Sequence, residues 1–186
     1  MSLYIGLDPS LDGTGVSIID HEYMIDSLYK LHTKAKDVNR LIQLELEFKE
    51  IIDKYRTDLV LCCFESPSYN SEGRLVEIGE WYGVFKLILF KAGIPCISVA
   101  PLQLKQYCTG EGKNFTKSVI MLHTFKNFGV EFDDDNKCDA YILSRIAHDY
   151  YHTYVLKSKL DLKEYHKKVL EKIHKAQEIK IKKKLL

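Results

Sequence analysis

The chain has 186 residues and a mass of 21.6 kDa, enough for one domain with a complete hydrophobic core. Apolar residues make up 46% of it, but their runs are strand-sized or broken by charges, so the pattern predicts neither a membrane span nor a signal peptide. The five cysteines are odd in number and show no CxxC pairing. They favour reduced, mostly buried thiols in a cytoplasmic protein.

The small net charge of +1 conceals a division along the chain. Residues 157–186 contain eleven lysines and four acidic residues, a net charge of +7, whereas residues 1–156 carry a net charge of −6. Clustered lysines indicate a polyanionic partner because binding to phosphates releases counterions, but a solvated helix face has the same composition. We therefore divide the chain into a body, residues 1–156, and a basic helical C-terminal extension, residues 157–186.

The first predicted element is an apolar strand over residues 3–8 that ends in Asp8. A carboxylate that leaves a buried strand lies at the open edge of an α/β sheet, where sites form, but an acid before a proline also begins ordinary turns. Gly13 and Gly15 are expected to let the chain turn into a second strand. The segment around Asp8 is therefore either part of a site or a plain turn.

The remaining elements follow from hydrophobic periodicity. Strands are predicted over residues 16–20, 23–31, 59–65 and 94–99, and helices over residues 38–55, 74–92, 117–128 and 140–151. Short connections make the first three strands antiparallel neighbours, and the last two need helical crossovers. This order predicts an α/β fold with a mixed five-stranded sheet, three antiparallel strands then two parallel ones, flanked by helices. It is the organisation of the ribonuclease H-like fold.

Three carboxylates stand at comparable places in these elements. Asp8 and Glu65 each end a strand, and Asp139 stands in the first turn of a helix. If the two strands are parallel neighbours, the three side chains meet and repel one another unless a cation compensates them. Mg²⁺ takes oxygen ligands and leaves room for water and phosphate, and a pair of such ions can activate water and stabilise a leaving oxygen. The pattern therefore predicts metal-dependent phosphodiester hydrolysis.

Several segments in order resemble RuvC-type Holliday junction resolvases over residues 3–150. IGLDPSLDGTGVSII is similar to the first strand of that family with its leading aspartate, and FESP to the strand-ending glutamate. LVEIGEWYGV resembles the helix that follows, and APLQLKQYCTGEGKNFTK the basic segment. DNKCDAYILSRIA resembles the last acidic helix. The resemblance implies an endonuclease that resolves four-way or other branched DNA. The composition and the added tail suggest a phage-encoded version that acts in the cytoplasm of a bacterial host.

The resemblance also implies a ligand set. Asp8, Glu65 and Asp139 match three catalytic metal ligands for Mg²⁺, with Mn²⁺ able to substitute and two ions in each site. The fourth ligand has two candidates. Asn136 stands at the matching position, where the family has an acid or a histidine, and Asp135 has the matching chemistry. A cluster of acids at a helix N-terminus is also favoured simply by the helix dipole.

The DNA contacts implied by the resemblance lie in two loops. Lys105 and Lys117 match the DNA-contacting lysines of the family, and Lys113 is a nearby addition. Tyr69 follows the strand-ending glutamate, where the family carries an aromatic residue that stacks at the junction centre. Lysines beside a loop are also commonly solvated, and a tyrosine can pack back on the body.

Two symmetric cuts in a four-way junction imply a homodimer. The candidate interface is the helix over residues 74–92, with Trp81, Tyr82 and Phe85, and a place in the hydrophobic core is the equal alternative for these aromatic residues. In the same helix Gly79 and Gly83 are four residues apart, which suggests close approach of a strand or a partner helix. The extension can fold on the body, cross to the partner subunit or lie along DNA.

Other functions share parts of this pattern. The YqgF-like relatives have the same fold and act on RNA, and the departure at Asn136 leaves room for a junction-binding protein without catalysis. Sugar-kinase-type ATPases also pair an early aspartate with glycines, but they close two such domains around a nucleotide. One copy of the domain argues against a nucleotide cofactor, and nothing in the composition points to a membrane partner.

Overall fold

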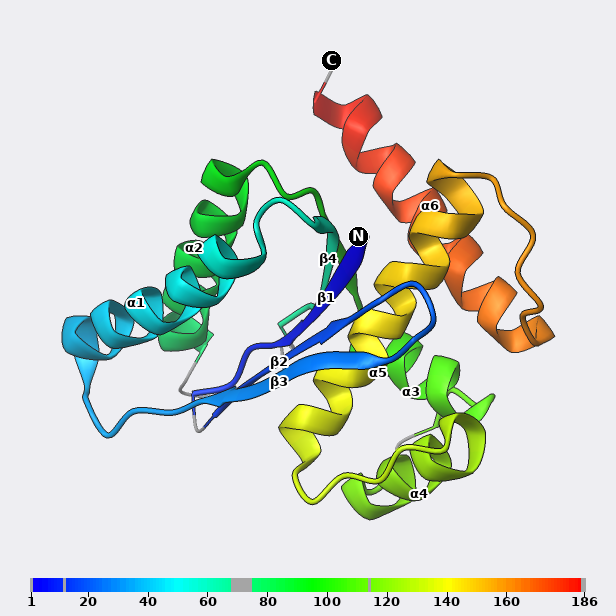
Figure 1. The fold of residues 1–186 in the computed structure, drawn as a ribbon, viewed down its shortest axis with the longest axis horizontal. Helices are drawn as coiled ribbons and strands as arrows, with labels where there is room; N and C mark the ends of the chain where they lie inside the picture. Colours follow the sequence, from blue (N-terminus) through cyan, green and yellow to red (C-terminus); the bar gives the residue numbers. More distant parts are fainter. Residues whose placement is uncertain (1, 12, 68–74, 114, 185–186) are drawn as a thin grey trace.

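The computed structural model describes residues 2–11, 13–67, 75–113 and 115–184, with side chains described up to residue 177. One five-stranded sheet, in the order β3-β2-β1-β4-β5, forms the centre of the molecule, and helices cover both of its faces (Figure 1). Within the described residues, no helix combines the length and apolar character that a membrane-spanning segment needs.

The strands run in the directions expected from their connections. The strands are β1 Leu3–Asp8, β2 Thr14–Ile19, β3 Ile25–Leu31, β4 Leu59–Glu65 and β5 Cys96–Val99. The β1–β2 and β2–β3 pairs are antiparallel, and the β1–β4 and β4–β5 pairs are parallel. The predicted mixed sheet is therefore confirmed.

Two helices differ from the prediction. The helices are α1 Asp37–Tyr55, α2 Leu75–Ala92, α3 Pro101–Thr109, α4 Lys117–Phe128, α5 Asp135–Tyr150 and α6 Glu164–Lys184, with a π-helical turn, η1 Tyr151–Val155, after α5. Helix α3 occupies the first half of the basic segment, where no helix is predicted. Helix α5 begins five residues earlier than predicted because Asp134 caps it, accepting a hydrogen bond from the backbone N–H of Lys137 at 3.1 Å.

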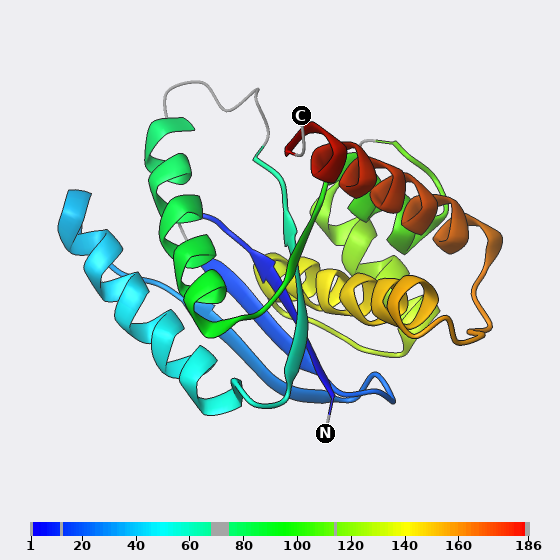
Figure 2. The same cartoon turned by 90° about the horizontal axis from the view of Figure 1, so that it is seen from above.

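The sheet separates two hydrophobic clusters, and the alternation of side chains along each strand sorts residues between them. On β1, Ile5 and Leu7 pack toward α1 and α2, whereas Tyr4 packs toward α5. Gly6 also lies on the α5 face, so Asp8, two residues further, leaves the strand on that side. Figure 2 shows α1 and α2 on one side of the sheet and α3, α5 and α6 on the other.

Two glycines let α5 lie directly on the sheet. A Cβ atom at Gly6 would stand 2.0 Å from the carbonyl oxygen of Ala140, and one at Gly15 would stand 2.0 Å from that of Asn136. Gly15 lies within β2 and not in the turn that the sequence suggests, so its role is close approach. Conversely, no atom of the described chain lies within 4 Å of a Cβ placed at Gly79 or Gly83, so that pair brings no other element of the chain closer.

The aromatic residues proposed for the interface belong to the core instead. Trp81 and Phe85 are fully buried and Tyr82 is 5% exposed, in the cluster between α1, α2 and the sheet. They are therefore unavailable to a partner subunit, because one face of α2 needs all three to cover the sheet.

The basic extension folds on the body, the first of the three uses considered for it. Val169, Leu170 and Ile173 of α6 are buried in the same cluster as residues of α3 and α5. The cysteines agree with the prediction of reduced thiols, since all five are free and only Cys96 is not fully buried.

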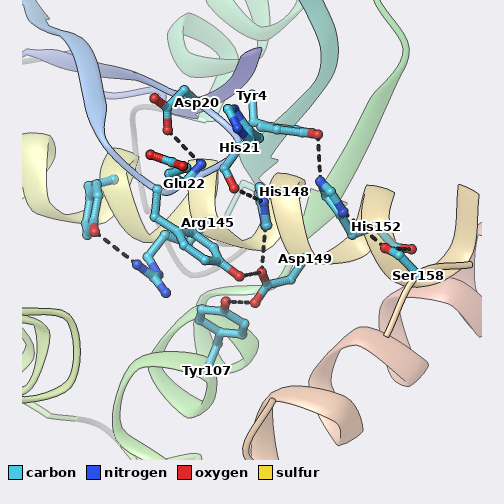
Figure 3. A network of polar contacts seen from close by, with 12 residues as sticks. Tyr4, Asp20, His21, Glu22, Tyr107, Arg145, His148, Asp149, His152 and Ser158 are labelled. Atoms are coloured by element: carbon cyan, nitrogen blue, oxygen red, sulfur yellow. Dashed lines mark hydrogen bonds and ion pairs between the residues drawn. The ribbon is translucent and has the colours of Figure 1, made fainter. Parts of the chain in front are cut away.

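The C-terminal end of α5 is held by a buried polar network (Figure 3). The Asp149 carboxylate accepts hydrogen bonds from the hydroxyls of Tyr23, at 2.7 Å, and Tyr107. It also faces Nδ1 of His148 at 2.9 Å, while Nε2 of that ring faces the carbonyl oxygen of His21 at 3.1 Å. Burial alone would raise the pKa of Asp149, but these hydrogen bonds hold it below its ordinary value. The network joins α5 to α3 and to the β2–β3 connection.

We expect Gly15→Ala to destabilise the protein by about 1–3 kcal/mol or more, because its methyl group would overlap a backbone oxygen that only a shift of α5 can move. Gly112→Ala is the matched control, since Gly112 faces open space, and it should leave stability nearly unchanged. Urea unfolding of both variants measures the difference. Equal stability of the two would mean that α5 adjusts without cost.

We expect Asp149→Asn to lower the free energy of unfolding by about 3–5 kcal/mol at neutral pH, because it leaves buried donors facing a neutral amide. Because the pKa of Asp149 is lower in the folded protein than in the unfolded chain, its charge stabilises the folded protein at pH values above the ordinary aspartate pKa. This stabilisation is lost as the pH falls through the lowered pKa. The difference between variant and wild type should therefore shrink below about pH 4. Urea unfolding across pH, with the exposed Asp53→Asn as control, measures it. A difference that persists unchanged in acid would contradict this account.

Candidate active site

The first two carboxylates of the site come from neighbouring parallel strands. Leu7 of β1 pairs with Phe64 of β4, so the next residues, Asp8 and Glu65, leave the sheet side by side. Both strands end here, at the edge where α/β sheets commonly carry their sites. Each of the two carboxylates is half-buried.

Helix α5 brings two further carboxylates to the same edge. Gly15 of β2 pairs with Asp8 of β1. The backbone carbonyl oxygen of Asn136, in the first turn of α5, lies directly over Gly15. The first turn of α5 therefore lies directly beside Asp8. Asp135 and Asp139, four residues apart, lie on the same side of this helix.

Glu65, Asp135 and Asp139 line a cleft of about 200 Å³. Its polar and charged lining residues are Glu65, Lys105, Lys117, Asp135 and Asp139, and apolar side chains complete its walls. Asp8 lies close enough to these carboxylates for their charges to raise its pKa. The structure thus brings together Asp8, Glu65 and Asp139, as the sequence predicts, with Asp135, Lys105 and Lys117 around them.

Two predicted site residues stand apart from this arrangement. Asn136 is half-buried and does not line the cleft. Lys113 is exposed at the surface in an ion pair with Glu111, at 2.6 Å. Tyr69 lies outside the described residues.

The carboxylates destabilise one another's charge. Burial, followed by the charges of Glu65, Asp139 and Asp135, raises the pKa of Asp8 well above its ordinary value. Burial and Asp139 raise the pKa of Glu65 to about 7, and burial and Asp135 raise the pKa of Asp139 to about 7. Groups with such shifts at a cleft are typical of functional sites.

Two lysines supply only part of the compensating charge. The ammonium group of Lys117 donates to the carboxylate of Asp135, which raises the pKa of Lys117. The positive charge of Lys105 acts against the rise in the pKa of Glu65 and of Asp139. If all four carboxylates are ionised, the two lysines leave an excess of negative charge, which a bound cation would neutralise.

The connection between β1 and β2 and the end of β4 are fixed by two residues that the sequence reasoning assigned to an interface. The indole Nε1 of Trp81 donates to Oγ1 of Thr14 at 2.8 Å, and that hydroxyl donates to the carbonyl oxygen of Ser10 at 3.1 Å. The hydroxyl of Tyr82 donates to the backbone carbonyl oxygen of Glu65. The sequence does contain a signal for this role. Trp81 and Tyr82 are adjacent aromatic residues with hydrogen-bonding atoms, and they lie in the helix that follows Glu65.

The donor set fits a hard divalent cation. In the described part of the chain, no three His, Cys, Asp or Glu side chains are already arranged as ligands around one point. Mg²⁺ does not require such an arrangement, because proteins usually bind it through one or two carboxylates, with water and substrate phosphate as the other ligands. Half-buried oxygens with excess negative charge meet this requirement.

Comparisons with known proteins agree on one family, although no family model matches the chain. The crossover junction endodeoxyribonuclease RuvC of Ruegeria pomeroyi is 27% identical over 154 residues, which cover 79% of this chain and 90% of the relative. The enzyme of that name from Caldicellulosiruptor saccharolyticus is 31% identical over 115 residues, which cover 59% of this chain and 69% of the relative.

Solved structures agree in fold. The RuvC structure of Thermus thermophilus has a TM-score of 0.67 at 17% identity and covers 84% of this chain and 97% of its own. The RuvC of that organism in complex with a Holliday junction substrate has a TM-score of 0.64 at 16% identity, and the match covers 77% of this chain and 90% of its own. With the sheet order, the paired strand ends and these similarities in sequence, the chain belongs to the crossover junction endodeoxyribonuclease RuvC family.

Proposed function

We propose that the protein resolves four-way DNA junctions by metal-dependent hydrolysis of phosphodiester bonds. The observation that carries the proposal is that two strands and one helix bring Asp8 close to Glu65 and Asp139, which line one cleft. Membership of the RuvC family supports it, since the relatives are named crossover junction endodeoxyribonucleases. One structural neighbour is bound to a Holliday junction substrate.

In this proposal the carboxylates of Asp8, Glu65 and Asp139 hold the divalent cations. Mg²⁺ suits these oxygen donors, Mn²⁺ substitutes for it, and we propose two ions in each site. When bound, such ions polarise the scissile phosphate, lower the pKa of the attacking water and stabilise the leaving oxygen. The raised pKa values of these carboxylates support the assignment, because the side chains repel one another without a cation.

Asp135 is the better candidate for the fourth ligand. It lines the cleft one helical turn before Asp139, whereas Asn136 does not line it. Its carboxylate pairs with Lys117, so metal binding would compete with that ion pair. Asn136 remains the alternative by position, and its amide oxygen could hold a ligand water.

The lysines hold the substrate and not the metal. Lys105 and Lys117 line the cleft, so each places a positive charge where the phosphates beside the scissile bond must lie. Lys113, at the exposed surface of the same segment, contacts phosphates further along the strand in this proposal. Such contacts position the backbone without reading its sequence.

We expect Asp8→Asn, Glu65→Gln and Asp139→Asn each to reduce cleavage of a four-way junction in Mg²⁺ by at least about a hundredfold, comparable with the loss of one preorganised electrostatic group. Binding to the junction should persist. The unfolding temperature should stay the same or rise, because each change removes one of the repelling charges. Gel assays of cleavage and binding, with thermal unfolding as the control for folding, measure these outcomes.

The same assay separates the alternatives. A wild-type protein that cuts structured RNA and spares junction DNA would indicate the RNA-processing function of the YqgF-like relatives. Tight binding of the junction without cleavage in either Mg²⁺ or Mn²⁺ would indicate a junction-binding protein. Full activity in any one carboxylate variant would remove that residue from the mechanism.

We further propose a homodimer that places one site on each of two symmetric strands. Helix α2 carries an exposed stripe at heptad-like spacing, formed by Val76, Gly79, Gly83, Leu87 and Phe90. Phe90 is 82% exposed and Val76 77% exposed, and the two glycines leave room for close approach of another helix. The helix is the one proposed from the sequence, but these residues lie on its opposite face.

We expect Leu87→Glu with Phe90→Glu to convert the protein to a monomer and to abolish paired cuts, because two charges would be buried in the interface. Leu122→Glu with Phe125→Glu on α4 is the matched control, since these side chains are similarly exposed. Analytical ultracentrifugation measures the oligomeric state. A wild-type protein that sediments as a monomer, or a control variant that dissociates equally, would contradict the assignment.

A further inference from the structure

Helix α6 presents a stripe of three lysines to solvent. Lys168, Lys172 and Lys175 are exposed and follow each other at intervals of four and three residues, so they lie along one side of the helix. The stripe extends over about 10 Å at the helical rise of 1.5 Å per residue. An acidic residue of α6 beside the stripe, Glu171, pairs with Lys175 at 2.5 Å.

The opposite face of α6 fixes the position of this stripe. Val169, Leu170 and Ile173 are at most 1% exposed, so the helix is anchored in the core of the body. Charged groups on an anchored helix lose less conformational entropy on binding than groups on a free tail.

The stripe runs along α3, the helix that leads to the cleft. Nζ of Lys172 donates to Oε1 of Gln106 at 3.3 Å. Next to Gln106 is Lys105, which lines the cleft with the carboxylates. At the end of α3, the ring of Tyr165 lies 3.3 Å from a Cβ placed at Gly110. The basic stripe therefore contacts the helix that carries Lys105 of the cleft.

The charge distribution of the whole chain favours a polyanion on this surface. The extension has a net charge of +7 and the rest of the chain −6, so long-range attraction of nucleic acid depends on the extension. Lysine-rich surfaces bind DNA mainly through phosphate contacts that release counterions, without reading bases.

We propose that Lys168, Lys172 and Lys175 bind the phosphate backbone of a duplex arm that leaves the junction, outside the crossover itself. The proposal rests on the proposed function for the identity of the nucleic acid. In this arrangement α6 holds the arm while Lys105 and Lys117 hold the strand in the cleft. The extension thus adds binding that is independent of catalysis.

The test compares two triple variants with the wild type. Lys168→Gln, Lys172→Gln and Lys175→Gln together remove the stripe and retain side-chain length and polarity. The control variant removes the same amount of charge elsewhere, by Lys49→Gln, Lys54→Gln and Lys91→Gln together. These lysines are exposed in the C-terminal halves of α1 and α2, the helices that precede β4 and β5. Affinity for a long-armed four-way junction is measured by fluorescence anisotropy with EDTA, over a range of salt concentrations. Circular dichroism and thermal unfolding establish that both variants fold.

We expect the stripe variant to lose at least about tenfold in affinity near 0.1 M salt and to reduce the slope of log K against log salt by about 2 to 3, since each phosphate contact contributes about 0.9. The control variant should change the slope by less than about 1. The loss should shrink when the arms are shortened toward the crossover, because the stripe then has no duplex to contact.

Two results would overturn the inference. In one, the stripe variant binds with the affinity and slope of the wild type. In the other, both triple variants lose affinity equally, which would mean that only total charge matters. Cleavage in Mg²⁺ is assayed separately with saturating protein. A wild type that never cleaves would refute the proposed function and leave the binding result intact, whereas a cleaving wild type with an unaffected stripe variant would refute only this inference.

Discussion

Helix α5 lies so close to β1 and β2 that two positions of the sheet, Gly6 and Gly15, have no room for a side chain. This contact decides where the first turn of the helix stands. Gly15 pairs with Asp8, so the helix end that carries Asp135 and Asp139 is brought to the end of β1. The active-site arrangement is therefore a consequence of backbone packing, and the acidic residues alone do not produce it.

The two ends of α5 carry carboxyl groups whose pKa values are shifted in opposite directions. At its C-terminal end, Asp149 is buried with hydrogen-bond donors that hold its pKa down, and the charge is stabilised by the fold. At its N-terminal end, Asp139 is half-buried beside other carboxylates, and its pKa is raised to about 7. Removing the partners of a buried charge that is fully hydrogen-bonded destabilises the fold. A carboxyl group at a cleft whose pKa is raised by its neighbours is instead typical of a site that binds a cation or substrate. One helix thus carries both the structural anchor and the chemistry.

The comparisons place the chain in the RuvC family, and α6 adds a row of exposed lysines to the fold. Because α6 shares its core with α3 and α5, the extension is fixed relative to the cleft. A rigid arrangement of two positive regions suits a branched substrate whose arms leave the crossover at fixed angles. The apolar stripe of α2 approaches α6 at one end, where Phe90 and Gln177 line the same pocket.

The sequence by itself determined the succession of strands and helices along the chain, the acids that end β1 and β4, and the charge division between residues 1–156 and 157–186. Those features follow from local periodicity and composition, which act between near neighbours in the chain. Only the tertiary structure decided that Asp135 lines the cleft and Asn136 does not, and that Trp81 and Tyr82 fix strand ends instead of forming an interface. It also decided that Gly15 serves the approach of α5. Each of these features depends on contacts between residues far apart in the chain. An amphipathic pattern predicts that one face of a helix or strand is buried, but it does not specify which other element packs against that face.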